Sequence, residues 1–176
     1  MRWRAAWLCA AVLMACGASA SSGSVTRLDQ LPQQWRDDRG AALALTGLLG
    51  QRVVISMAYT RCHTQCPATI AQLQRMQSAL DARGEQASFV IVGYDPDGDD
   101  PASWHQYRIN HRLERNNWYF LTGSLQQTRQ LARQLGFDFW TYDTHVMHHS
   151  RLVIFDAQGH WRGAINPASG NWSALL

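Results

Sequence analysis

Lysine is absent from the 176-residue chain, and all 16 basic residues are arginines scattered along it. No run of basic residues occurs, and no stretch interleaves basic with aromatic residues. Proteins that bind nucleic acids carry such patches or stripes, so we do not expect DNA or RNA as a partner. The formal net charge is +3 and 46% of the residues are hydrophobic, a composition typical of a globular protein with one domain.

A long hydrophobic run is also missing. The apolar stretch at residues 5–16 has 12 residues, which is short for a membrane-spanning helix. Two arginines precede it and small residues at 18–20 follow it, a pattern typical of a secretory signal peptide. We therefore predict that residues 1–20 direct export to the periplasm. Two other interpretations stay open: a lipoprotein signal that ends before Cys16, which then carries a lipid anchor, and an uncleaved membrane anchor.

Cysteine is scarce in this chain. Of its four cysteines, Cys9 and Cys16 lie in the predicted signal, and only Cys62 and Cys66 belong to the remaining sequence. In an oxidising compartment, two thiols this close in sequence form a disulfide, a metal site, or each in turn. The pair is therefore the first candidate for chemistry.

The rest of the chain is organised as one unit. Residues 21–27 are predicted to be a short flexible linker, and residues 28–176 a single domain. Apolar strand-like segments alternate in it with segments of helical periodicity that have caps. The predicted strands are residues 52–59, 87–93, 118–121, 151–155 and 160–164, and the predicted helices start near Pro67, Pro101 and Ser124.

This alternation predicts an α/β fold in which parallel strands are covered by helices. The last two strands form a hairpin, so the sheet is mixed. A central mixed β-sheet flanked by helices is the arrangement of the thioredoxin-like fold. The segment before residue 50 is expected to add an N-terminal hairpin.

Cys62 and Cys66 lie between a predicted buried strand and a predicted helix start, in the segment Cys62-His63-Thr64-Gln65-Cys66-Pro67. Backbone N–H groups and the helix dipole favour negative charge there, so a thiol in that place is expected to have a lowered pKa. At this spacing the two sulfurs can form a disulfide or hold one ion together. Two soft thiolates with an added imidazole suit copper.

Candidates for the imidazole precede the predicted strand at residues 151–155, in a loop that a thioredoxin-like sheet packs beside the cysteines. His148 and His149 are adjacent there, and side chains of an extended chain alternate between faces. Only one of the two is therefore expected to point at the cysteines. His63, between the cysteines, and His145 are lesser candidates.

Three segments together resemble the SCO/SenC family of copper chaperones. They are CHTQCP at residues 62–67, the acidic loop YDPDGDDP at 94–101, and HHS at 148–150. The family has a Cys-x3-Cys-Pro motif, an acidic Asp-Pro loop after the next strand, and a histidine before a late strand. The similarity extends over about residues 43–165, which is most of the predicted domain.

The resemblance implies a thioredoxin-like fold and three copper ligands. By position these are Cys62, Cys66 and His149, the last because it directly precedes Ser150. It also implies that Asp95 supports the site from the acidic loop, and that the protein delivers copper to, or reduces thiols at, the CuA centre of cytochrome c oxidase. The expected partner is thus the CuA-bearing subunit of that enzyme or another copper or thiol protein.

The sequence departs from the family pattern at four places. His63 stands where proline is common, His148 where aspartate is common, Asp100 where threonine is usual, and Met57 where phenylalanine is frequent. None of these changes removes a ligand. They do alter the surroundings of the site, on which recognition of a partner depends.

A second function suits the same residues. Cys62 and Cys66 could cycle between dithiol and disulfide without metal, with Cys62 as the nucleophile. A peroxidase fits poorly because of the order of Thr60 and Arg61 and the spacing of the cysteines. A purely structural disulfide would close only a short loop and would stabilise little. We therefore interpret the chain as a metallochaperone rather than an enzyme, with a thiol–disulfide oxidoreductase as the alternative.

Overall fold

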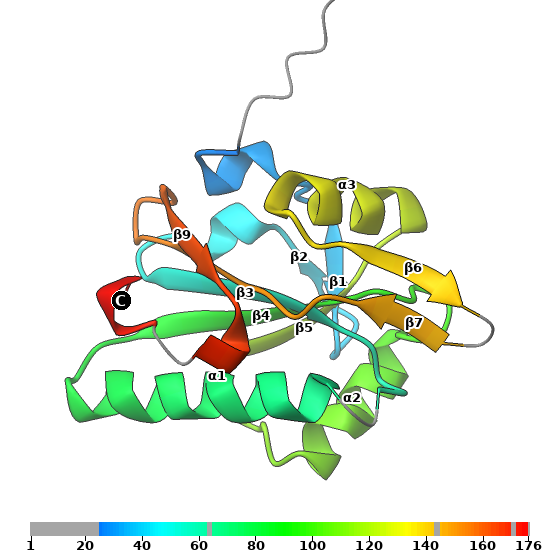
Figure 1. Ribbon diagram of the computed structural model, residues 1–176, viewed down its shortest axis with the longest axis horizontal. Coiled ribbons are helices and arrows are strands. Elements are labelled where there is room, and N and C mark those ends of the chain that lie inside the picture. Colours follow the sequence, from blue (N-terminus) through cyan, green and yellow to red (C-terminus); the bar gives the residue numbers. More distant parts are fainter. Residues whose placement is uncertain (1–24, 63–64, 143–144, 170–171, 176) are drawn as a thin grey trace, which may run out of the picture.

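The computed structural model describes residues 25–62, 65–142, 145–169 and 172–175 (Figure 1). The predicted signal at residues 1–20 and the candidate ligand His63 lie outside the described residues. Within the described part, no helix is both long and apolar enough to cross a membrane.

A seven-stranded mixed sheet forms the centre of the molecule, with strand order β2-β1-β5-β4-β3-β8-β9. Its strands are β1 Trp35–Asp37, β2 Ala42–Leu43, β3 Arg52–Ala58, β4 Ala87–Gly93, β5 Trp118–Thr122, β8 Leu152–Phe155 and β9 Trp161–Ile165. β3, β4 and β5 are parallel, whereas β8 runs antiparallel to β3. β4 is buried along its whole length, as expected for a strand covered on both faces.

Helices cover both faces of this sheet, with α1 and α2 on one side and α3 on the other (Figure 1). Their bounds are α1 Gln65–Ala82, α2 Pro101–Asn110 and α3 Leu125–Leu135, with short 3-10 turns η1 Leu28–Gln30, η2 Leu45–Leu48, η3 Pro167–Ser169 and η4 Ser173–Leu175. The α/β thioredoxin-like prediction is thus confirmed. Ser124 and Gln127 form the expected capping box of α3, and Gly136 ends that helix at a φ of +70°, which is readily accessible to glycine.

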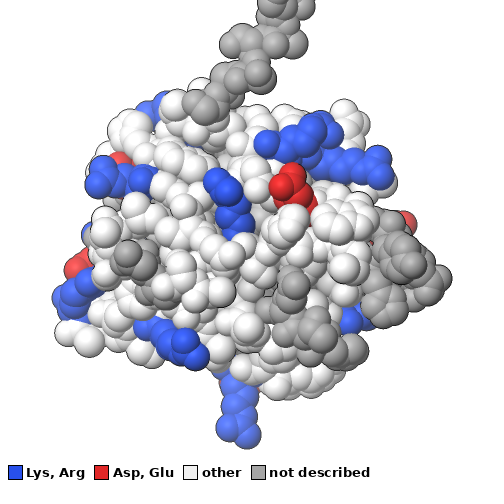
Figure 2. Space-filling model, in the orientation of Figure 1, with Lys and Arg blue, Asp and Glu red and all other residues white. Residues whose placement is uncertain are grey.

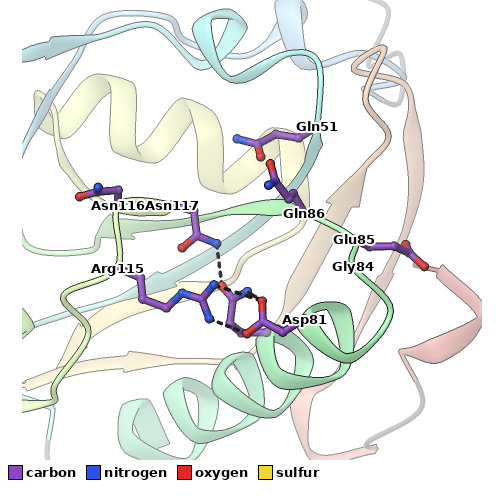
Figure 3. Close-up of a pocket in the computed structure, with 9 residues that line it drawn as sticks. Gln51, Asp81, Gly84, Glu85, Gln86, Arg115, Asn116 and Asn117 are labelled. Carbon is purple, nitrogen blue, oxygen red and sulfur yellow. Dashed lines mark hydrogen bonds and ion pairs between the residues drawn. The ribbon is translucent and has the colours of Figure 1, made fainter.

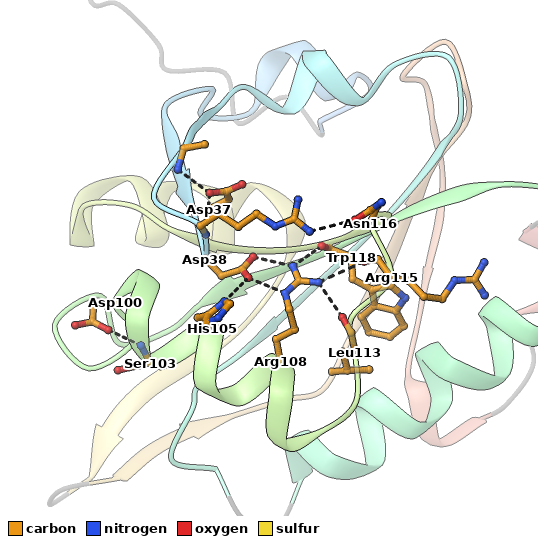
Figure 4. A network of polar contacts seen from close by, with 12 residues as sticks. Asp37, Asp38, Asp100, Ser103, His105, Arg108, Leu113, Arg115, Asn116 and Trp118 are labelled. Atoms are coloured by element: carbon orange, nitrogen blue, oxygen red, sulfur yellow. Dashed lines mark hydrogen bonds and ion pairs between the residues drawn. The ribbon is translucent and has the colours of Figure 1, made fainter.

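The predicted N-terminal hairpin is present as β1 and β2, and β1 extends the sheet beside β5. A buried ion pair attaches it to α2 (Figure 4): Arg108 donates to both carboxylate oxygens of Asp38, at 2.6 and 2.7 Å. Arg108 also donates to the carbonyls of Leu113 and Trp118. Burial alone would raise the pKa of Asp38, but the hydrogen bonds and charge of Arg108 outweigh it and hold that pKa below 3.8.

Ordered packing begins earlier than the expected domain start at residue 28. Val25 is buried, the carbonyl of Thr26 accepts from the N–H of Trp161, and Arg27 forms a β-bridge with His160. The last residues of the predicted linker therefore lie along β9 as part of the domain.

One pair of strands was not predicted. β6 Phe139–Tyr142 and β7 His145–His148 form a separate antiparallel ribbon in a region where we expected a loop. Trp140 is 49% exposed because it lies on the outer face of this ribbon. On the opposite face, Phe139 packs against the buried ring of Tyr94.

Arginine side chains are spread over several elements of the face seen in Figure 2, with uncharged surface between them. This distribution agrees with their scattering along the sequence.

Candidate metal centre

Two cysteines and one histidine meet beside the N-terminal end of α1. The Nε2 atom of His148 lies 3.7 Å from Sγ of Cys66 and 4.0 Å from Sγ of Cys62. The three candidate ligand atoms all lie within 4.8 Å of one another, and all three residues are buried. One ion placed among these atoms can contact all of them.

The path from β3 into α1 places the two sulfurs. After β3 the chain turns, with the N–H of Cys62 donating to the carbonyl of Tyr59 at 3.1 Å. α1 then begins at Gln65, so Cys66 lies in its first turn and its N–H donates to Sγ of Cys62 at 3.3 Å. A backbone N–H left unpaired at a helix start is thereby used to hold the first sulfur.

The expected lowering of a thiol pKa is not found at Cys66. Its pKa is raised, first by its hydrogen bond with Cys62 and then by burial. Without metal, Cys66 is therefore held as a neutral thiol, and a metal ion must displace its proton to bind the thiolate.

An aromatic enclosure holds the imidazole of His148. Tyr94 stacks on it with ring centroids 4.7 Å apart, and Tyr59 meets it edge-on at 5.9 Å. The nitrogen that faces the cysteines is Nε2. Nδ1 of His148 has no hydrogen-bond partner among the described residues. Two thiols and one imidazole in a buried pocket are a donor set that fits a soft copper ion.

His149 lies on the other side of the strand. Its side chain is 73% exposed, with Nδ1 4.0 Å from a carboxylate oxygen of Asp138. Because β7 is extended, neighbouring side chains alternate, and the inward position belongs to His148. The structure therefore brings His148, rather than the expected His149, to the cysteines.

Asp95 does not reach the three candidate ligands. Its carboxylate pairs with the exposed Arg61 at 2.6 Å, so it contacts the neighbour of Cys62 rather than a sulfur or an imidazole. The acidic loop places a second residue beside the site.

Asp99 is that residue, and sequence reasoning missed it. It is buried, and one oxygen accepts from the N–H and the hydroxyl of Thr60 at 2.7 and 2.9 Å, while the other accepts from the N–H of Asp95. Burial raises its pKa to about 6, against the effect of these hydrogen bonds. A signal for this role exists: β3 and β4 are parallel neighbours, so the loop after β4 must lie beside the turn after β3.

Surface cavities flank the centre on two sides. His148 and His149 line one of about 490 Å³ together with α1 and η3 residues, and Cys62 lines another of about 450 Å³ with α2 residues. A third, polar cavity of about 480 Å³ contains the Asp81–Arg115 ion pair (Figure 3). Asp81 lies near the opposite end of α1, roughly 22 Å from Cys66 along the helix, so that cavity is not part of the centre.

Comparison with known proteins identifies the family and the fold. The family described as SCO1/SenC matches residues 30–175. A SCO1 protein homolog of Bacillus subtilis is 27% identical over 114 residues, which are 65% of this chain and 58% of that protein. The chain thus spans somewhat more than half the length of this curated relative.

Solved structures share the fold. A SCO1/SenC family lipoprotein of Bacillus anthracis has a TM-score of 0.71 at 22% identity, covering 76% of this chain and 82% of that one. Arabidopsis thaliana ScoI with copper bound has a TM-score of 0.71 at 19% identity, covering 82% and 94%. Yeast Sco1 with copper bound has a TM-score of 0.68 at 21% identity, covering 77% of each chain.

Proposed function

Because the chain belongs to the SCO1/SenC family, we propose that it is an exported copper metallochaperone whose cargo ion is bound by Cys62, Cys66 and His148. One observation carries this proposal: the three ligand atoms lie within 4.8 Å of one another in a buried site. Two sulfurs and one imidazole nitrogen satisfy the preference of Cu(I) for soft ligands, and the imidazole also suits Cu(II).

Release of the ion takes place by ligand exchange. Cys62 lines a surface cavity, whereas Cys66 lines none of the described ones. An incoming donor from a partner therefore reaches Cys62 before Cys66. As that donor binds, the Cys62 thiolate leaves the ion, and the aromatic enclosure keeps the imidazole of His148 in place until the transfer is complete.

The proposed recipient is the CuA-bearing subunit of cytochrome c oxidase. The resemblance of the cysteine, acidic-loop and histidine segments to the family supports this choice, and a solved structural neighbour is described as a member of the Sco family of cytochrome c oxidase assembly proteins. The residues that differ from the family pattern, such as His63 and Asp100, leave another copper or thiol protein as the alternative recipient.

The proposed location is the periplasm. The arginines and apolar stretch of residues 1–20 support export, and one structural neighbour is a SCO1/SenC family lipoprotein. We propose that the mature protein is either soluble or held at the membrane by a lipid on Cys16.

Thiol–disulfide exchange is the second candidate function. Cys62 and Cys66 are not joined by a disulfide in this structure and lie side by side, with the N–H of Cys66 donating to Sγ of Cys62. In the reaction, Cys62 attacks a partner disulfide, Cys66 resolves the mixed disulfide, and two electrons and two protons pass to the partner. This function requires both cysteines and no imidazole ligand.

Copper titration of the reduced protein separates these functions. We expect one copper per chain bound at the cysteine centre, with thiolate–Cu(II) charge-transfer absorption. Cys62→Ser and His148→Ala should weaken binding at least tenfold and change these bands, whereas His149→Ala should keep them. Wild-type affinity in Cys62→Ser and His148→Ala would contradict the copper function, and thiol exchange that survives in His148→Ala would favour the oxidoreductase. If only His149→Ala lost the bands, His149 would be the ligand.

A further inference from the structure

The outer face of the β6–β7 ribbon carries a second group of metal-binding side chains. The strand register places Trp140 opposite Met147. Just beyond the last strand pair, the N–H of His149 donates to the carbonyl of Asp138. Since Phe139 and His148 occupy the inner face, alternation places these four residues together on the outer one.

Contacts confirm that these side chains are neighbours. The rings of Trp140 and His149 have centroids 5.9 Å apart, a diagonal contact across the ribbon. The carboxylate of Asp138 lies 4.0 Å from Nδ1 of His149. Met147 and His149 are two residues apart, which corresponds to about 6.6 Å along an extended chain, within reach of a flexible thioether.

Packing does not account for this arrangement. Trp140 is 49% exposed and Met147 44% exposed, and they are two of the few large hydrophobic residues exposed in the described part. The others, Leu49, Ile109 and Leu125, lie on separate elements. An exposed tryptophan directly opposite an exposed methionine leaves apolar surface in water, so a ligand that uses both side chains would explain why they are there.

Their chemistry points to one kind of ligand. A thioether is a soft donor that selects Cu(I), imidazole binds the same ion, and the face of an indole attracts a cation. The Asp138 carboxylate lies on the Nδ1 side of the His149 ring, so Nε2 is the nitrogen left to bind metal. We propose that Met147 and His149 bind one soft monovalent cation, Cu(I) or its analogue Ag(I), on the outer face of the ribbon, with Trp140 against the ion.

This outer site is distinct from the cysteine centre but close to it. His148, a proposed ligand of the inner ion, lies between the two outer ligands in sequence, and both histidines line the same cavity of about 490 Å³. The outer site therefore lies beside a cavity that is also lined by His148. It requires no cysteine, so it can be tested independently of the copper function proposed above.

Titration with Ag(I) tests the site in the full chain with all four cysteines replaced by serine, so that no thiol contributes. We expect one Ag(I) per chain and quenching of tryptophan fluorescence at the same stoichiometry. Met147→Leu and His149→Ala, each added to this background, should weaken binding at least tenfold. Trp140→Phe should abolish most of the quenching and leave binding detectable by equilibrium dialysis. Circular dichroism confirms that each variant is folded.

His160→Ala is the matched control, because His160 also lies beside a carboxylate, that of Asp156 at 3.4 Å. This variant should bind Ag(I) as tightly as the parent does. Met147→Leu preserves the apolar surface, so a patch that only contacts another protein would be unaffected by it. The proposal is overturned if the cysteine-free chain binds no Ag(I), or if Met147→Leu and His149→Ala bind it as tightly as the parent. With the cysteines present, loss of one of two bound Cu(I) ions in Met147→Leu would identify the outer site even if the inner ligands were reassigned.

Discussion

Asp99 holds the turn that carries Cys62 through its hydrogen bonds to the N–H and hydroxyl of Thr60. Asp99 is packed closely against the end of β4, since a Cβ added at Gly93 would lie 2.8 Å from Cβ of Asp99. The hydroxyl of Thr122 donates to the carbonyl of Asp99 as well. Asp99 thus connects the ends of three parallel strands beside the cysteines, two through its carboxylate and the third through its main-chain carbonyl.

The raised pKa of Asp99 gives a stability effect with a definite sign. Burial raises this pKa from 3.8 to about 6, so the folded protein binds the proton more tightly than the unfolded chain. The free energy of unfolding should therefore fall by about 3 kcal/mol as pH rises from about 3 to about 7. Urea unfolding of wild type and Asp99→Asn across this pH range measures the effect. The difference between their free energies of unfolding should change with pH.

A substitution of the exposed Asp97 by asparagine is the control, and it should retain the wild-type profile. Parallel curves for wild type and Asp99→Asn would show that Asp99 does not titrate in this range. Asp38 acts with the opposite sign, since its lowered pKa makes its contribution disappear only as the solution becomes more acidic than pH 3.8.

At the scale of single residues, sequence reasoning identified the cysteines but not their supporting partners. Cys62 and Cys66 could be predicted because their spacing and their place before a helix are local properties. The choice between His148 and His149 could not, since it depends on the phase of a strand whose partner had not been recognised. The role of Asp99 depends on contacts with Thr60 and Asp95 that only the folded chain creates.

At the scale of elements, long apolar strands and capped helices were predicted, and the β6–β7 ribbon was not. β3 and β4 have seven residues each, most of them apolar and buried, so the apolar pattern of the sequence agrees with the burial in the structure. β6 and β7 have four residues each, mix polar with aromatic side chains, and pair only with each other. Short strands of this kind are marginal without packing, and the contact of Phe139 with Tyr94 supplies it.

The attachment of the N-terminal hairpin to α2 gives a prediction at the same scale. Asp38→Ala leaves the guanidinium of Arg108 buried without its carboxylate, which should reduce the free energy of unfolding by about 3–5 kcal/mol. Asp29→Ala breaks the exposed pair with Arg27 and should cost less than about 1 kcal/mol. Chemical denaturation measures both.

Copper absorption should be unchanged in Asp38→Ala, because neither Asp38 nor Arg108 is a candidate ligand or lines the cavity beside Cys62. An equal loss of stability in Asp38→Ala and Asp29→Ala would contradict the role assigned to burial. Altered copper bands in Asp38→Ala would show that the hairpin influences the metal centre.

At the scale of the whole molecule, the proposed copper ion joins distant parts of the chain. Its ligands lie in the turn after β3, in the first turn of α1 and at the end of β7, and His148 is 82 residues from Cys66 and 86 from Cys62. The ribbon that carries His148 pairs with no strand of the main sheet. A bound ion would therefore connect the ribbon to the centre of the fold.

Copper loading should consequently stabilise the protein against unfolding. Free copper at about 1,000 times the dissociation constant adds about 4 kcal/mol to the free energy of unfolding when only the folded state binds it. The bound ion also closes a long loop of the chain, which helps to order the ribbon. Thermal unfolding of the reduced protein should show a higher Tm with Cu(I) than with a Cu(I) chelator, and Cys62→Ser should lose most of this difference. The amide N–H of Met147, in the ribbon, should exchange more slowly with copper bound. Equal Tm values and equal exchange with and without copper would mean that the ion does not join these segments.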